Sequence, residues 1–231
     1  MRERVVVLDF GGQYNQLIAR RVREAGVYSE LISHDAPLEK IKGDCLSAII
    51  LTGGPDSVYA EDAKSCDNAI FDLGVPILGI CYGMQYIAKV FGGTIASAAI
   101  REYGHTQIRT SGHPLFKGLG SVVWMNHNDS VTRAPDGFQA IAETDACPVA
   151  AFADENRRLY GIQFHAEVTH TENGQLMFQN FLRDVCGLDC DYSAANLRDE
   201  LIGQIKRQVG SSRVIGALSG AIAIGIGLLA L

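Results

Sequence analysis

The stretch of sequence that bears most directly on the fold is residues 75–93, which read VPILGICYGMQYIAKVFGG. An apolar run over residues 75–80 reaches Cys81, and a helical stretch begins at once and continues to Gly92. A short apolar strand that passes directly into a helix is the repeating unit of an open parallel sheet.

The same alternation of strand and helix precedes this stretch. Residues 5–10 form a β-branched apolar run that ends at Gly11, and apolar residues at helical spacing then continue to Gly26. Two further apolar runs cover residues 27–32 and 48–52. The sequence therefore predicts an α/β fold with an open, mostly parallel, flavodoxin-like sheet flanked by helices.

The middle of the chain follows a different pattern. Between about residues 94 and 164, short apolar runs alternate with turn-rich segments, which is typical of antiparallel hairpins added to the parallel sheet. Helices are expected over 173–185 and 194–209. These patterns place one domain at residues 1–190, a linker helix at 191–212 and a separate segment at 213–231.

Composition limits the classes of protein to which the chain can belong. With 231 residues, of which 47% are hydrophobic and 20% charged, it is long enough for one full domain and too apolar for wholesale disorder. A formal net charge of -6 speaks against a nucleic-acid partner, because phosphate contacts require a basic surface.

Cysteine usage and hydropathy bear on location. The six cysteines show no zinc-ligand spacing and the first residues form no signal-peptide pattern, so we expect no metal and a cytoplasmic protein with reduced thiols. Residues 214–231 carry no charge, but this length is marginal for a membrane span, and flanking aromatic anchors are absent. We expect no membrane association.

Cys81 is the candidate nucleophile. Residues 79–83, Gly-Ile-Cys-Tyr-Gly, have the spacing of a G-x-S-x-G nucleophile elbow with Cys in place of Ser, at a strand-to-helix junction. Such a turn holds the nucleophile in a strained conformation, and the flanking glycines leave room for it. The helix N-terminus favours the thiolate. A lone cysteine is more often structural, but this context favours a nucleophile.

A thiolate nucleophile needs a base, and the base needs a group that orients it. His165 and Glu167 lie two residues apart in a segment predicted to be extended, so their side chains point to the same side. One carboxylate can therefore hold the neighbouring imidazole, and we predict a catalytic triad of Cys81, His165 and Glu167.

Acyl transfer also requires an oxyanion hole. The backbone N–H of Tyr82, directly after the nucleophile, is one natural donor, and Gly54 in the Gly-Gly-Pro stretch after a predicted strand is the second. Gln85 lies one helical turn beyond Cys81, where its amide can hydrogen-bond a polar substrate.

Together these motifs resemble those of the class I, triad-type glutamine amidotransferases. The Gly-Gly-Pro stretch, the elbow with Gln85 and the stretch 164–168, Phe-His-Ala-Glu-Val, are shared with the whole class. Narrower motifs resemble the branch whose synthetase partner aminates XMP to GMP, and they lie at residues 9–14, 16–24, 53–59, 113–116, 124–131 and 168–171. The resemblance covers about residues 4–190.

The resemblance implies a reaction and a binding site. Cys81 would attack the side-chain amide of glutamine, His165 would protonate the departing ammonia, and Glu167 would orient His165. A loop at residues 126–129 would hold the amino-acid end of glutamine. The residues implied to bind substrate are Gly53, Gln85, Asn126, Asn128 and Asp129.

The resemblance also implies partners. The glutaminase reaction needs no cofactor, and its ammonia would pass to an ATP-pyrophosphatase synthetase domain or subunit that uses ATP and magnesium to aminate XMP. A homodimer of the full-length enzyme is compatible with the family.

The sequence departs from the family pattern at three places. Ala166 stands where the family usually has Pro, with a modest expected effect, because Ala can adopt the same extended conformation. Asn128 stands where the family has Gly, and Asn is the next best residue if φ there is positive. Residues 214–220 resemble the start of an ATP-pyrophosphatase domain, but the polar pyrophosphate loop is missing at 221–224. Segment 213–231 is therefore expected to be an incomplete or altered start of that domain.

Two other interpretations stay open. The chain could serve another synthase, such as anthranilate or carbamoyl phosphate synthase, although the motifs at 13–24 and 168–171 speak against it. It could also be a non-catalytic binding or regulatory module with the same fold. An intact set of Cys81, His165 and Glu167 speaks against that.

Overall fold

A computed structural model of the chain describes residues 3–43, 45–193, 202–203 and 205–210. The chain divides into two compact units, Met1–Tyr192 and Ser193–Leu231. In the second unit, residues 202–203 and 205–209 are helical, within the span predicted as a helix. The segment predicted to resemble a synthetase domain, residues 213–231, lies outside the described residues.

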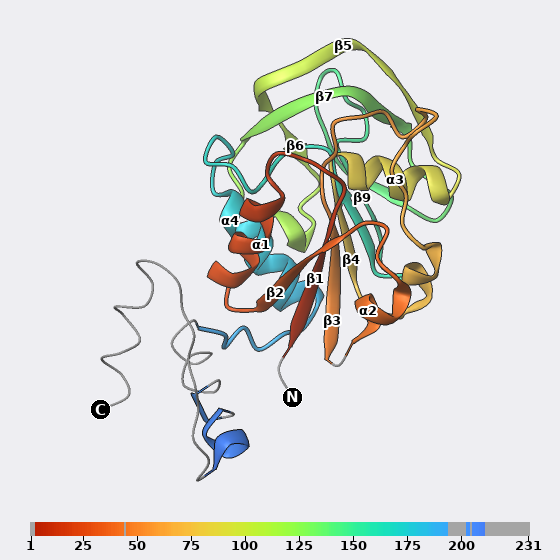
Figure 1. Cartoon of the computed structure of the whole chain (residues 1–231). Coiled ribbons are helices and arrows are strands. Elements are labelled where there is room, and N and C mark those ends of the chain that lie inside the picture. Colours follow the sequence, from red (N-terminus) through yellow and green to blue (C-terminus); the bar gives the residue numbers. More distant parts are fainter. Residues whose placement is uncertain (1–2, 44, 194–201, 204, 211–231) are drawn as a thin grey trace, which may run out of the picture. The chain divides into compact units, whose positions relative to one another are not determined.

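Within the described part of the first unit, eight strands form a mixed sheet in the order β2-β1-β3-β4-β10-β9-β8-β6. The five strands from β2 to β10 are parallel, and the remaining pairs are antiparallel. The prediction of a mostly parallel α/β sheet with added antiparallel hairpins is therefore confirmed (Figure 1). The strands are β1 Arg4–Asp9, β2 Tyr28–Ser33, β3 Leu46–Leu51, β4 Ile77–Ile80, β6 Arg109–Thr110, β8 Gln139–Glu143, β9 Ala151–Asp154 and β10 Leu159–Ile162.

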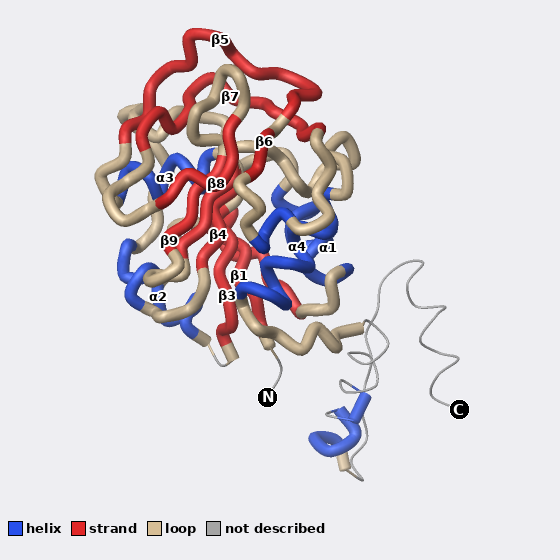
Figure 2. The backbone as a smooth tube through the Cα atoms, turned by 180° about the vertical axis from the view of Figure 1, so that it is seen from behind, coloured by secondary structure: helices blue, strands red, loops and turns tan. Residues whose placement is uncertain are grey.

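Helices cover both faces of this sheet, as the tube view from behind also shows (Figure 2). Alternate residues of β1 explain the two layers: Val5 and Val7 pack with α1 and α4, whereas Val6 and Leu8 pack with α2 and α3. The helices are α1 Asn15–Glu24, α2 Leu38–Lys42, α3 Tyr82–Val90 and α4 Gly174–Asn180, with shorter helical segments η1 Asn68–Asp72, η2 Pro114–Phe116 and η3 Phe181–Val185.

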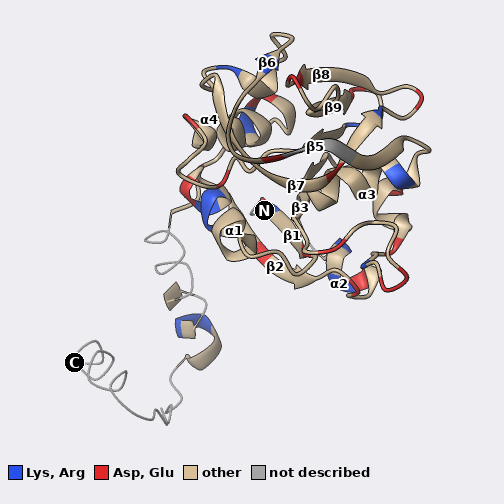
Figure 3. Cartoon of the chain, turned by 90° about the horizontal axis from the view of Figure 1, so that it is seen from above, with Lys and Arg blue, Asp and Glu red and all other residues tan. Residues whose placement is uncertain are grey.

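A second sheet pairs β5, Thr94–Gln107, with β7, Val122–Arg133, in antiparallel fashion. Its register shifts between Ser97 and Glu102, which marks a bulge in β5. Seen from above, β5 and β7 run across the end of the main sheet (Figure 3). No pattern in the sequence predicted the long strand β5.

Candidate active site

The predicted site residues gather where the parallel strands end. The carboxyl ends of β1, β3, β4 and β10 lie at one edge of the sheet, because all four strands run in the same direction. At this edge, β1, β3 and β4 are followed by the segments that contain Gly11, Gly53 and Cys81. His165 lies three residues after the end of β10. Open α/β sheets bind ligands at this edge, where the strand order reverses.

A cavity of about 460 Å³ opens at this edge of the sheet. Two sources supply its walls, namely the segments that follow the parallel strands and the facing strands β5 and β7. The lining residues are Gly11 to Asn15, Ile18, Gly53 to Ser57, Cys81, Tyr82, Gln85, Tyr103, Asn126 to Asp129, His165 and Glu167. All ten residues predicted from sequence for catalysis, the oxyanion hole and substrate binding are among them.

The backbone at Cys81 has the conformation of a nucleophile elbow. Cys81 connects β4 directly to α3 with φ 52° and ψ −106°, a strained combination for a residue with a side chain. A Cβ on Gly79 would lie 2.5 Å from the backbone of Gly83, and one on Gly83 would lie 2.4 Å from the carbonyl oxygen of Leu51. The two glycines are therefore required by close packing between β4, α3 and β3.

His165 and Glu167 form a buried pair. The Nδ1 of His165 lies 2.6 Å from Oε1 of Glu167, and both side chains are almost fully enclosed. Burial acts to lower the pKa of His165, but the charge of Glu167 and a hydrogen bond with Cys81 outweigh it, so that pKa lies well above its ordinary value. The site therefore favours a protonated imidazole at His165.

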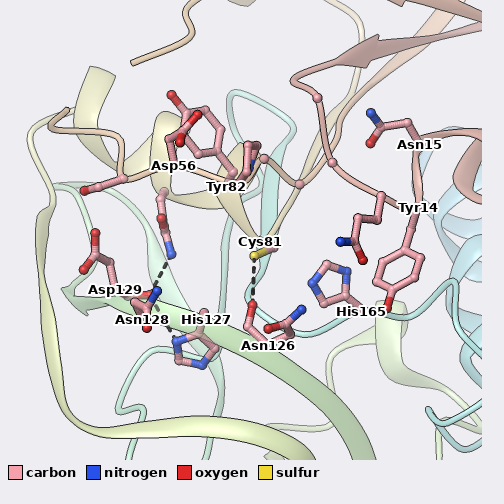
Figure 4. Close-up of a pocket in the computed structure, with 18 of the residues that line it drawn as sticks. Tyr14, Asn15, Asp56, Cys81, Tyr82, Asn126, His127, Asn128, Asp129 and His165 are labelled. Atoms are coloured by element: carbon pink, nitrogen blue, oxygen red, sulfur yellow. Dashed lines mark hydrogen bonds between the residues drawn. The ribbon is translucent and has the colours of Figure 1, made fainter. Parts of the chain in front are cut away.

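Contacts from neighbouring elements fix this pair. The Nε of Arg21 in α1 donates to the backbone oxygen of Glu167 at 2.9 Å. The hydroxyl of Thr171 donates to the backbone oxygen of His165 at 2.6 Å. The ring of Tyr14 meets the His165 ring edge-on, with centroids 5.3 Å apart (Figure 4). The imidazole is thus held on several sides.

The sulfur of Cys81 faces the cavity between two elements. Its Sγ lies 3.9 Å from the backbone oxygen of Asn126 in β7 (Figure 4). On the other side, a Cβ on Gly53 would lie 3.7 Å from Cβ of Cys81 and 3.4 Å from the ring of His165. Glycine at position 53 therefore keeps the space beside Cys81 and His165 open.

One expectation is wrong in detail. Residues 126–129, which were expected to form a loop, lie inside the continuous strand β7, and Asn128 is extended there rather than in the positive-φ region. The reason is pairing with β5, which the sequence did not predict. Gln85 reaches this strand, since its Nε2 donates to the backbone oxygen of Asp129 at 2.7 Å.

Several cavity residues were not predicted. Tyr14 and Asn15 follow the first strand in the motif-bearing stretch, so their position after a parallel strand could have identified them. Tyr103 comes from the unpredicted β5, and its hydroxyl donates to Oδ1 of Asn128 at 2.6 Å. His127 is buried, with its Nε2 3.3 Å from the carboxylate of Glu102.

The described residues contain neither a cluster of metal ligands nor a membrane-spanning helix. No group of three or more His, Cys, Asp or Glu side chains in the described ranges could hold a metal ion. Among those residues, no helix has the length and apolar character needed to cross a bilayer.

The fold and the geometry of this cavity define a class of protein, and comparison with known proteins agrees with it. Residues 6–185 match the sequence model of the family described as glutamine amidotransferase class-I, and the chain belongs to this family. It is 52% identical over 225 residues to the GMP synthase [glutamine-hydrolyzing] of Clostridium perfringens, and 50% identical over 220 residues to that of Mycobacterium leprae.

These matches cover 96% and 94% of this chain but 44% and 42% of the relatives, so the chain spans less than half the length of the curated relatives it matches. Among solved structures, a protein described as a putative GMP synthase subunit, from Thermoplasma acidophilum, is 32% identical, with a TM-score of 0.72 over 87% of this chain and 98% of the other. A glutamine amidotransferase from Thermotoga maritima, 20% identical, shares the fold with a TM-score of 0.61 over 91% of this chain and all of the other. The resemblance to class I glutamine amidotransferases that the motifs indicated is confirmed.

Proposed function

We propose that this chain hydrolyses glutamine to glutamate and ammonia with a triad of Cys81, His165 and Glu167. The observation that carries the proposal is the meeting, in one cavity, of a strained elbow cysteine and a histidine held 2.6 Å from a buried carboxylate. This is the arrangement that nucleophilic catalysis by a thiolate requires.

The first half of the reaction forms a thioester. The thiolate of Cys81 attacks the side-chain carbonyl carbon of glutamine, so that a C–S bond forms and the carbonyl electrons move to oxygen. When the tetrahedral intermediate collapses, the C–N bond breaks and the protonated His165 gives its proton to the leaving nitrogen. Ammonia departs, and Glu167 stabilises the imidazolium before this transfer and fixes the tautomer after it.

The second half releases glutamate. Water, with neutral His165 as general base, attacks the thioester carbon, and the C–S bond breaks to restore the thiolate and the imidazolium. The oxyanion of both halves would be bound by the backbone N–H groups of Tyr82 and Gly54. Tyr82 is the first residue of α3, and the first N–H groups of a helix have no hydrogen-bond acceptor within the helix. Gly54 lies close by, since a Cβ there would be 3.1 Å from the Tyr82 ring.

The substrate's amino-acid end would lie against β7. The residues proposed to bind this end line the cavity around Cys81. They come from the segment after β3 (Gly53), from α3 (Gln85) and from β7 (Asn126, Asn128 and Asp129). Backbone groups and amide side chains there can bind an α-amino and an α-carboxylate group.

We further propose that the ammonia serves the amination of XMP to GMP by an ATP-pyrophosphatase domain or subunit that uses ATP and magnesium. The support is the name of the relatives, GMP synthase [glutamine-hydrolyzing], and the fact that this chain matches 44% of such a relative. A protein acting with such a partner is expected in the cytoplasm.

The glutaminase proposal is tested by trapping Cys81 with a diazo-ketone analogue of glutamine, followed by intact-mass analysis and peptide mapping. We expect one label at Cys81, protection by excess glutamine and no label in Cys81→Ala. A folded protein that labels at several cysteines, or at none, contradicts a formed glutamine site. Turnover is then measured as glutamate release, with and without a GMP synthetase domain, XMP, ATP and magnesium.

A further inference from the structure

A chain of side-chain amides runs behind the nucleophile. The Nε2 of Gln85 donates to the backbone oxygen of Asp129 at 2.7 Å and to Oε1 of Gln163 at 3.1 Å. The Nε2 of Gln163 in turn donates to Sγ of Cys81 at 3.6 Å. Three separate parts of the fold are joined in this way, namely β7, α3 and the segment after β10.

The direction of this chain follows from its first acceptor. A backbone carbonyl can only accept, so the end of Gln85 that faces Asp129 has to be the amide nitrogen. The same nitrogen faces Gln163, which must therefore present its oxygen to Gln85. The amide nitrogen of Gln163 is then at its other end, where the sulfur of Cys81 lies.

Burial makes this arrangement matter for the charge on sulfur. The side chain of Gln163 is fully buried and that of Gln85 is 4% exposed, so water does not satisfy the donor. The backbone N–H of Gln163 is fixed to the oxygen of Ala150 at 2.8 Å, which limits movement of the residue. A neutral thiol is a weak acceptor, whereas a thiolate accepts a charge-assisted hydrogen bond.

We propose that Gln163 is a hydrogen-bond donor to the nucleophile: its side-chain N–H favours the thiolate of Cys81, and Gln85 positions it by holding its carbonyl oxygen. The inference rests on the proposed function, because it assigns a further residue to the same nucleophile. The triad supplies the proton acceptor, and Gln163 supplies a neutral donor that binds the sulfur before substrate arrives.

The test changes the donor while it preserves the size of the side chain. Gln163→Glu keeps an oxygen for Gln85 but places a second oxygen against the sulfur, and Gln163→Met removes both polar ends. Gln139→Glu, at an exposed position of β8, is the matched control for the added charge. The readout is the alkylation rate of Cys81 by iodoacetamide against pH, measured by peptide mapping in the full chain.

Other thiols do not obscure this readout. Burial raises the pKa of Cys66 to about 11 and that of Cys147 to about 12, and it also raises the pKa of Cys186 and Cys190. Deprotonation of these four thiols is therefore shifted to higher pH, and peptide mapping separates them and Cys45 from Cys81.

In Gln163→Glu we expect the pH of half-maximal alkylation to rise by about one unit, which lowers the rate about tenfold at pH values below the wild-type midpoint. Gln163→Met should shift it in the same direction by less, and Gln139→Glu should match the wild type. Unchanged midpoints in folded Gln163 variants would overturn the inference. If Gln163→Glu does not fold, the result for Gln163→Met decides.

Alkylation does not require glutamine, so the two proposals fail separately. A midpoint that shifts as expected in a protein that neither binds nor hydrolyses glutamine would leave the donor role standing and refute the glutaminase proposal. Normal glutamine hydrolysis with an unchanged midpoint in both Gln163 variants would support the glutaminase proposal and refute the donor role of Gln163.

Discussion

Two sides of the same cavity are built in different ways. The elbow side comprises the ends of β3, β4 and β10 with the start of α3, and its positions are set by backbone contacts that leave no space for a Cβ at Gly79 or Gly83. The facing side comprises β5 and β7, where buried and exposed positions alternate and Tyr103 is 58% exposed.

Under the proposed function, this difference corresponds to a division between reaction and recognition. The reacting groups need fixed geometry in a water-poor setting, which the closely packed carboxyl ends of parallel strands provide. Three of the five residues proposed to contact the amino-acid end of glutamine, Asn126, Asn128 and Asp129, come from the partly solvated strand β7. Substitutions on the elbow side should therefore have large effects, and those on the β5–β7 side should have small ones.

The largest effect is expected for Glu167→Gln. The amide would present an N–H toward Nδ1 of His165 and so favour the wrong tautomer, and the charge that raises the pKa of His165 would be lost. The kcat for glutamine hydrolysis should fall by about 10³- to 10⁴-fold with little change in thermal stability. Glu61→Gln, at an exposed position, is the control. A loss below tenfold would show that Glu167 does not orient the base.

The next largest effect is expected for Gly83→Ala, measured by urea denaturation. The new Cβ would lie 2.4 Å from the carbonyl oxygen of Leu51, so β3 and α3 would have to separate. We expect the free energy of unfolding to fall by about 1–3 kcal/mol, the usual range for overpacking. Gly203→Ala, in a helical position where the nearest side-chain atom lies at 3.5 Å, should cost nothing. Equal stability of the two variants would mean that the elbow side can deform.

The same difference explains what the sequence could predict. On the elbow side, β3 and β4 lie in short apolar runs, and the elbow is encoded within five residues, so both are local signals. The contact between His165 and Glu167 was also predicted, but from an extended segment, whereas the structure has bends at residues 163–164 and 166–168 and still brings the two side chains together.

The β5–β7 side depends on contacts between distant residues. The strand β5 includes Ser97, Glu102 and Gly104 and contains a bulge, so it lacks regular alternation. Its position is fixed by pairing with the distant strand β7, as between Gly104 and Met125. The position of residues 126–129 in a strand follows from this pairing. The role proposed for Gln163 was equally hidden, since it depends on the side-chain conformation of a residue 82 positions from Cys81.

A third prediction concerns pH and the interior of the β5–β7 side. Burial lowers the pKa of His127 below its ordinary value, although the charge of Glu102 opposes this. Below about pH 6.5 the unfolded chain therefore binds a proton that the folded chain does not, and stability falls with falling pH.

Between pH 6.5 and 5.5 the wild type should lose up to about 1 kcal/mol more unfolding free energy than His127→Gln. Urea denaturation at several pH values measures the difference between the two slopes. If the unfolding free energy depends on pH equally in both proteins, or more steeply in the variant, His127 becomes protonated in the folded state. The β5–β7 side is then more solvated than its burial indicates.

The smallest effect is expected for Tyr103→Phe. The substitution removes the hydroxyl that donates to Oδ1 of Asn128 at 2.6 Å, and it leaves the ring and the strand in place. Because the pair is exposed, its loss should raise the KM for glutamine by about two- to tenfold, the equivalent of one ordinary hydrogen bond, with kcat unchanged. Steady-state glutaminase kinetics on wild type and variant provide the measurement. A fall in kcat at constant KM would instead mean that Asn128 affects the reacting groups, and the division between a reacting side and a recognition side would no longer hold.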